Sequence, residues 1–290
     1  MAVDLNENLN SINSKIPSLN QWPLFLKNQT LPILKATQRG ILLEKQKYEK
    51  GELSDSRILA KIILNDPVMT VHLLSFMHYL KAKNLRNEIR TIQSALVMMG
   101  MQPFFNQFSN LPIIENVLKD FPKALLNVFK IIQKAQRAAD FAQNWAIRKN
   151  DLNLDEIRTA ALLHPLAEIL IGIFFPDVLL KFNQTLKENP GIRSRDVQIK
   201  ILGFTAFDLQ MLLNEHLHLP YLLKELMNER KEKESQRVKM VHLAIRLARH
   251  SAQNWNDSAL PDDYAEIAKM LGLDLPSTLK IIGVPELKNS

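Results

Sequence analysis

Histidine and carboxylate side chains are the groups of this chain that could bind a metal ion or move a proton. There are seven histidines and no cysteine. Glu215, His216 and His218 form the densest group, but residues two apart on a helix point about 200° apart and cannot converge on one ion. His72 and His78 are six residues apart, a poor separation for shared ligation. We therefore expect packing or surface roles for these side chains.

The remaining candidates for chemistry are equally weak. His242 and His250 are eight residues apart without a further ligand between them. Asp155-Glu156 and Asp262-Asp263 fall in predicted first helical turns, where negative charge complements the helix dipole. The absence of cysteine excludes disulfides, thiolate metal sites and cysteine nucleophiles. No Gly-x-Ser-x-Gly, GxxxxGK[ST] or GxGxxG motif occurs, so serine-hydrolase and nucleotide-binding loops are excluded as well.

The elements that would position these residues are predicted to be helices. Apolar residues recur three and four apart almost throughout, and the chain has only 8 glycines. Asp66-Pro67 is a strong helix start, because the carboxylate caps free N–H groups and proline loses nothing at the first helical position. It predicts a helix over 67–79, and the longest apolar stripe predicts another over 123–148. We expect an all-α fold of about a dozen helices and no sheet.

The chain has no fixed-period repeat and no long linker rich in glycine, serine or proline. Pro112 and Pro122 flank a short predicted helix, so two helical lobes are expected to meet near residues 110–122. The expected organisation is a flexible N-terminal segment at 1–21, an N-terminal helical lobe at 22–115 and a second helical lobe at 116–290.

Composition and hydropathy fit a soluble protein. Hydrophobic residues make up 46% of the chain and charged residues 23%, as in ordinary globular proteins. The polar first fifteen residues resemble neither a signal peptide nor an anchor. The longest apolar run in the most hydrophobic window, residues 169–175, is too short to span a bilayer. We expect a cytoplasmic protein that does not insert into membranes.

The net charge of +7 raises the question of an anionic partner. Lys81, Lys83, Arg86 and Arg90 fill one predicted connector and are the candidate partner-binding residues. No aromatic residue for base stacking interleaves them, and charges of both signs surround them. We therefore favour a protein partner over nucleic acid, which stays open as an alternative.

Several short runs occur in an order that is informative. Segment 62–74 reads Ile-Ile-Leu-Asn-Asp-Pro-Val-Met-Thr-Val-His-Leu-Leu, and segment 92–100 reads Ile-Gln-Ser-Ala-Leu-Val-Met-Met-Gly. Upstream lies Leu-Pro at 31–32, and downstream follow Ala-Ala-Leu-Leu-His at 160–164, Gly-Phe-Thr at 203–205, Leu-Pro at 219–220 and Val-His-Leu-Ala at 241–244. Together these runs resemble the HDOD family over about residues 22–275. The resemblance implies a bilobal helical bundle with an HD-domain-like second lobe.

HDOD proteins are regarded as non-enzymatic bacterial signalling modules related to HD metal phosphohydrolases. The HD enzymes need a histidine, a His-Asp pair and a later aspartate to hold metal ions that activate water. Here the resemblance places His164-Pro165 at the His-Asp pair, Gln133 or a neighbour at the earlier histidine and Ile245 at the late aspartate. Ala206 replaces a further histidine-like position. We expect no catalytic residues, no cofactor and no divalent ion held by protein ligands around His164.

The Asn-Ser that is common in HDOD proteins after the second helix of the first lobe is absent here, and residues 76–79 read Phe-Met-His-Tyr. No role is carried over to that stretch. The favoured function is a non-enzymatic regulatory protein of bacterial signal transduction that acts as a protein-interaction scaffold. The alternatives are a divergent HD-type metal-dependent phosphohydrolase and a basic, helical nucleic-acid-binding protein.

Overall fold

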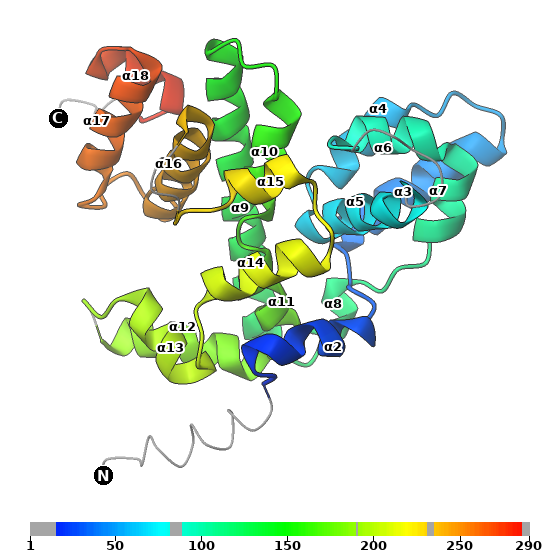
Figure 1. Cartoon of the computed structure of the whole chain (residues 1–290), viewed down its shortest axis with the longest axis horizontal. Coiled ribbons are helices and arrows are strands. Elements are labelled where there is room, and N and C mark those ends of the chain that lie inside the picture. The colour runs from blue at the N-terminus through cyan, green and yellow to red at the C-terminus, as the bar shows by residue number, and fades with distance from the viewer. Residues whose placement is uncertain (1–15, 82–88, 190, 231–234, 286–290) are drawn as a thin grey trace. The chain divides into compact units, whose positions relative to one another are not determined.

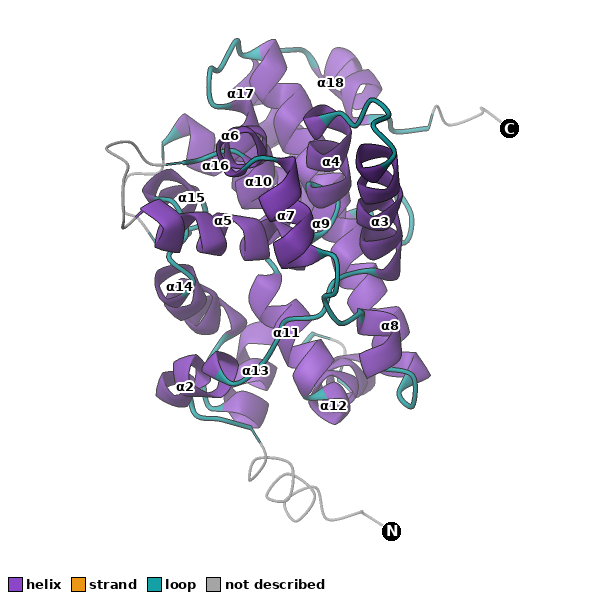
Figure 2. Ribbon diagram, turned by 90° about the vertical axis from the view of Figure 1, so that its right-hand side faces the viewer, coloured by secondary structure: helices purple, strands orange, loops and turns teal. Residues whose placement is uncertain are grey.

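The computed structural model describes residues 16–81, 89–189, 191–230 and 235–285. Within these ranges Figure 2 shows helices and loops and no strand. A single isolated parallel bridge joins Ile33 and Ile113. The expected all-α fold is therefore confirmed. In chain order the helices are η1 (Leu19–Gln21), α2 (Trp22–Lys27), α3 (Lys35–Glu49), α4 (Ser56–Ile63), α5 (Pro67–Lys81), α6 (Ile92–Met99), α7 (Met101–Phe108), α8 (Ile114–Val117), α9 (Pro122–Arg148), α10 (Leu154–Leu163), α11 (Leu166–Phe174), α12 (Pro176–Glu188), α13 (Ser194–Leu202), α14 (Ala206–His216), α15 (Tyr221–Leu226), α16 (Gln236–His250), α17 (Leu260–Leu271) and α18 (Leu275–Ile282).

The chain divides into two compact units, and each is built from two separate stretches of sequence. Unit 1 comprises Met1–Ile132 and Pro165–Leu219, and unit 2 comprises Gln133–His164 and Pro220–Ser290. The first turns of α9 belong to unit 1 and its later turns to unit 2. The expected limits of the segments at 21/22 and 115/116 stay a prediction, and residues 1–15 of the N-terminal segment lie outside the described residues.

Unit 1 contains two groups of packed helices. In the first, α4 packs against α3 and α6, and α6 also contacts α5 and α7. In the second, α11 packs against α12 and α14, and α12 against α13. A Cβ atom at Gly172 would lie 2.7 Å from side-chain carbons of both Val128 and Leu179. The missing side chain therefore lets α11 approach α9 and α12 closely.

The start of α5 shows how the local sequence directs the fold of unit 1. As the sequence predicts, α5 begins at Pro67, directly after the capping residue Asp66. One carboxylate oxygen of Asp66 accepts hydrogen bonds from the backbone N–H groups of Val68 and Met69, at 2.9 and 3.0 Å. The other accepts the N–H of Leu34 at 2.8 Å. A residue that is wholly buried thus caps α5 and also holds the chain just before α3.

The helices of unit 2 pack against one another in successive pairs. α10 contacts α15 and α16, α16 packs against α17, and α17 against α18. Figure 1 shows α16, α17 and α18 side by side. Every residue of α10 from Glu156 to Leu163 is buried. The connection between α9 and α10 is held to the start of α16 by an ion pair of 2.7 Å between Asp151 and Arg237.

One stretch among the described residues, Leu154–Phe174, is long and apolar enough to cross a membrane. It comprises α10 and α11, and 78% of its most apolar window is buried inside the fold, as is normal for core helices. A second candidate exists only if α4 and α5 are taken as one span, and these two helices are bent by 119° relative to one another.

Candidate functional site

The position of the HD-type His-Asp pair lies at the break between α10 and α11. The backbone N–H of His164 donates to the carbonyl of Ala160 at 3.0 Å and so ends α10. Pro165 follows as the N-cap of α11, because proline lacks the N–H that a continuing helix would need. The His164 side chain is thus fixed at a corner of the backbone and is only 18% exposed.

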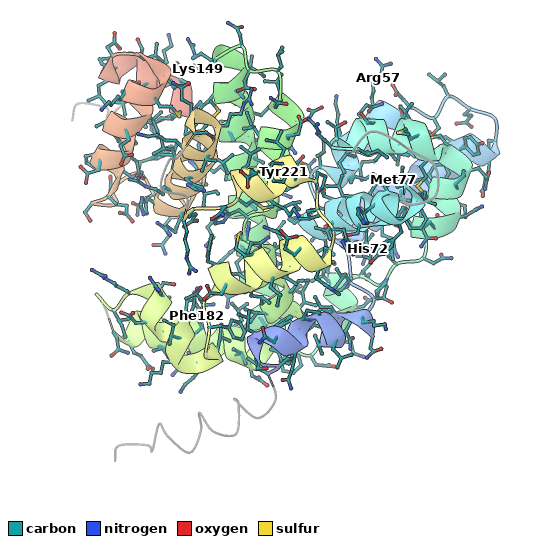
Figure 3. The ribbon with its side chains drawn as sticks, viewed as in Figure 1. Arg57, His72, Met77, Lys149, Phe182 and Tyr221 are labelled. Atoms are coloured by element: carbon teal, nitrogen blue, oxygen red, sulfur yellow. The ribbon has the colours of Figure 1, made fainter. Side chains whose placement is uncertain are left out.

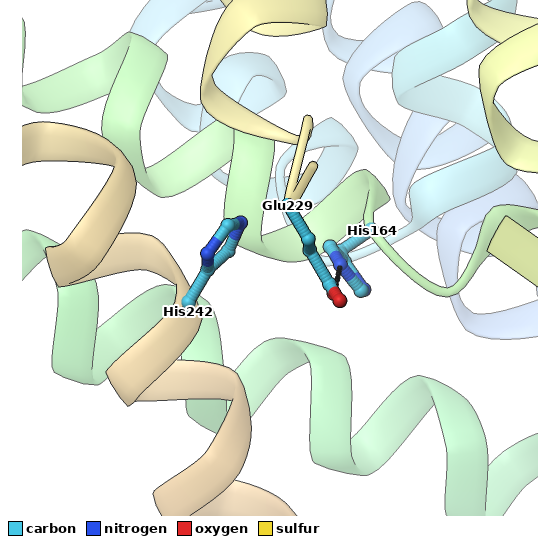
Figure 4. A group of neighbouring side chains, drawn as sticks. All are labelled: His164, Glu229 and His242. Carbon is cyan, nitrogen blue, oxygen red and sulfur yellow. Dashed lines mark hydrogen bonds and ion pairs between the residues drawn. The ribbon is translucent and has the colours of Figure 1, made fainter. Parts of the chain in front are cut away.

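His164 meets two side chains from other segments of unit 2. Its Nε2 atom lies 2.7 Å from Oε1 of Glu229, in the connection between α15 and α16. The ring of His242, on α16, has its centroid 6.2 Å from that of His164, at an interplanar angle of 70°. One potential ligand atom from each residue lies within 4.8 Å of the other two. Figure 4 shows the three side chains, with a dashed line for the contact between His164 and Glu229. We call them the His-Glu-His cluster.

The electrostatics of the cluster favour an ionised carboxylate. The hydrogen bond from His164 is the main reason why the pKa of Glu229 lies below its ordinary value. Partial burial raises this pKa, and electrostatic interactions with His164, His242 and Arg249 lower it further. Ionised Glu229 therefore accepts the hydrogen bond, and Nε2 of His164 donates it.

The residues at the other HD positions do not fit a two-ion hydrolytic centre. Pro165 has no side-chain donor atom, and Ile245 is a half-buried apolar residue of α16. Gln133 is exposed on α9. Ala206 begins α14 in unit 1, where its N–H donates to Oε1 of Gln198 at 2.9 Å. Of the named residues that the resemblance places at metal-binding positions of HD enzymes, His164 alone carries an imidazole or carboxylate group.

The sequence model of the HDOD domain family matches residues 38–233, which is well over half of the length of the chain. The chain belongs to the HDOD family. The resemblance of its short sequence runs to that family is thereby confirmed.

Two solved structures are similar to this HDOD protein. The MmoQ response regulator of Methylococcus capsulatus str. Bath superposes with a TM-score of 0.67 at 18% identity, over 88% of this chain and 98% of that one. A virulence factor of Campylobacter jejuni superposes with a TM-score of 0.64 at 19% identity, over 92% and 96%. No curated protein matches in sequence. At these identities the likeness shows the fold, and it agrees with the expected HD-related helical bundle.

Among the described residues, the other histidines form no three-residue cluster with carboxylates of the kind seen at His164. The rings of His78 and His218 stack with centroids 4.3 Å apart. His72, which Figure 3 shows on α5, donates from Nε2 to the carbonyl of Leu31 at 2.7 Å, and burial lowers its pKa. Partial burial and the charge of His218 lower the pKa of His216. The packing roles expected for His72 and His78 agree with these contacts.

The role of Asp263 in the structure goes beyond the one expected from the sequence. It lies in the first turn of α17, as the sequence predicts, but it is also wholly buried. Its two carboxylate oxygens accept hydrogen bonds of 2.6 Å from Arg246 and from Nδ1 of His250. Arg246 also pairs with Glu266 at 2.9 Å. Complementing the helix dipole is therefore only part of what Asp263 does.

The candidate partner-binding residues lie mostly outside the described structure. Lys83 and Arg86 belong to residues 82–88, which are not described. Lys81 is the last residue of α5, and the position of its side chain is not described either. Arg90 is exposed just before α6. Their role as a shared binding surface therefore stays a prediction.

Proposed function

We propose that this HDOD protein is a regulatory protein of a signalling pathway that acts by binding partner proteins and does not hydrolyse phosphate esters. The observation that carries the proposal is the residue set around His164. Proline, glutamine and isoleucine occupy positions at which HD enzymes bind metal, so water has no pair of ions to activate it. The similar structure from M. capsulatus is named a response regulator, which supports a role in signalling. The cytoplasm is the proposed location.

A phosphohydrolase assay tests the non-enzymatic part of the proposal. Untagged protein is incubated with bis(4-nitrophenyl) phosphate and 4-nitrophenyl phosphate in the presence of Mg²⁺, Mn²⁺ or Zn²⁺. We expect the release of nitrophenol to equal that of a matched His164→Ala variant with every ion. Turnover that requires a metal ion and disappears in His164→Ala would establish the divergent phosphohydrolase instead.

The choice between a protein and a nucleic-acid partner is tested with a variant of the basic residues between α5 and α6, called the connector variant. In the test variant Lys81, Lys83, Arg86 and Arg90 are all changed to glutamine. We expect chemical cross-linking in the native cell to trap partner proteins with the wild type and fewer with this variant. The purified protein is expected not to bind random DNA or RNA below micromolar concentrations at physiological salt, where binding to a phosphate polymer loses much of its strength.

A control for net charge is available on α9 and directly after it. Changing Lys130, Lys134, Arg148 and Lys149 to glutamine removes the same charge from a different part of the chain. This control is expected to keep the cross-linked partners. Sub-micromolar binding to random nucleic acid that is lost in the connector variant and kept in the α9 variant would replace the protein partner with nucleic acid.

A further inference from the structure

Against the sequence-based expectation of no divalent ion around His164, we infer that His164, Glu229 and His242 form a binding site for one transition-metal ion, for which Zn²⁺ is the best match. Two imidazole nitrogens and one carboxylate oxygen are a ligand set that Zn²⁺ accepts with water in the fourth position. Mg²⁺ and Ca²⁺ prefer sites built from oxygen atoms. The site differs from the metal centre of HD enzymes, because neither Glu229 nor His242 occupies one of that centre's positions.

The geometry is close to what a tetrahedral ion needs. With bonds of about 2.0–2.1 Å, the ligand atoms of a tetrahedral zinc site lie about 3.4 Å apart. In the cluster the pair of His164 and Glu229 is closer, at 2.7 Å, and one atom from each residue lies within 4.8 Å of the other two. Small side-chain rotations would bring all three atoms to bonding distance. The ion would then take the place of the proton that His164 and Glu229 share.

The chain positions of the ligands suggest what a bound ion does. His164 ends α10, Glu229 lies 65 residues further along the chain, and His242 belongs to α16. The ion would thus join the end of α10, the connection after α15 and the second turn of α16. Because the ligands must come together in the folded state, binding should stabilise unit 2.

Zinc binding is measured on full-length protein from which any tag has been removed and which has been dialysed against a chelator. Elemental analysis and calorimetry are expected to give one Zn²⁺ per chain, and added Zn²⁺ should raise the melting temperature. Co²⁺ in place of Zn²⁺ should give the intense visible absorption of a tetrahedral ion. Loss of a side chain that only hydrogen-bonds to a metal ligand weakens metal binding by about 10–100-fold. Glu229 and His242 are proposed to bind the ion directly, so Glu229→Gln and His242→Gln should each weaken binding at least as much.

The controls separate this site from adventitious binding to histidines. Glu229→Gln keeps the shape of a side chain that is 48% exposed, so the variant is expected to fold. His216→Gln changes a half-buried histidine of unit 1 and is expected to bind Zn²⁺ as the wild type does. No stoichiometric binding, or equal binding by Glu229→Gln and His216→Gln, would overturn the inference. Neither result bears on hydrolysis, which the phosphohydrolase assay decides separately.

Discussion

Replacement of Asp66 by alanine is expected to lower the free energy of unfolding by about 3 kcal/mol. The carboxylate accepts three backbone N–H groups, from Leu34, Val68 and Met69, and it is wholly buried. Alanine offers no acceptor, and water has no ready access to donors at this position. Urea unfolding followed by circular dichroism measures the change, and the slope of the transition shows whether cooperativity is kept.

Asp66→Asn is the matched control. Burial raises the pKa of the Asp66 carboxyl, while hydrogen bonds from Leu34, Met69, Thr37 and Val68 lower it. Asparagine keeps one oxygen that can accept two hydrogen bonds and avoids a buried charge. We expect Asp66→Asn to lower the free energy of unfolding by less than half as much as Asp66→Ala does. If Asp66→Ala changed the unfolding free energy by less than about 1 kcal/mol, the carboxylate would not be the anchor of α5.

Replacement of Arg246 by methionine is expected to destabilise unit 2 by about 2–3 kcal/mol. It removes the hydrogen bond of 2.6 Å to Asp263 and leaves a wholly buried carboxylate that keeps its hydrogen bond to His250. Breaking a fully buried ion pair costs about 3–5 kcal/mol, and the expected value is lower because solvent reaches part of Arg246. Thermal unfolding of the variant and the wild type at equal protein concentration measures the difference.

Two further variants identify the cause of that loss. Adding Asp263→Asn to Arg246→Met should restore part of the stability, because the buried charge that has lost its arginine partner is then gone. Lys239 contacts Glu266 at 3.8 Å on the surface, so Lys239→Gln should change stability by less than about 0.5 kcal/mol. A loss in Lys239→Gln as large as that in Arg246→Met would show that surface charge, and not the buried carboxylate, is responsible.

The sequence predicted those parts of the fold that depend on neighbouring residues. Asp66-Pro67 marks a helix start by local chemistry, and α9 was expected over 123–148 and extends over Pro122–Arg148. Thr91 caps α6 in the same local way, because its hydroxyl oxygen accepts the N–H of Ser94 at 3.2 Å. Capping and helical periodicity act over a few residues, so they can be read without knowing the tertiary structure.

The His-Glu-His cluster could not be found in this way. Its members come from three segments, and Glu229 lies in a charged run that reads as a solvated connection. Sequence spacing relates His242 only to His250, which is on the same helix. His250 instead binds Asp263 of the next helix, and His242 lies near His164 of α10. Contacts of this kind depend on how the helices pack against one another. The spacing of residues along one sequence does not predict them.

The interleaved connectivity of the two units affects how the chain must fold during synthesis. α10 leaves the ribosome with most of its residues destined for burial, yet α15 and α16, which cover it, begin only at Tyr221 and Gln236. Unit 1 is likewise incomplete until Leu219 has been made. Unit 1 can complete its core once Leu219 has emerged, whereas unit 2 cannot do so until the C-terminal stretch from Pro220 has been made. Truncations that end before α15 would therefore expose α10, and they are poor starting points for isolating a separately folded domain.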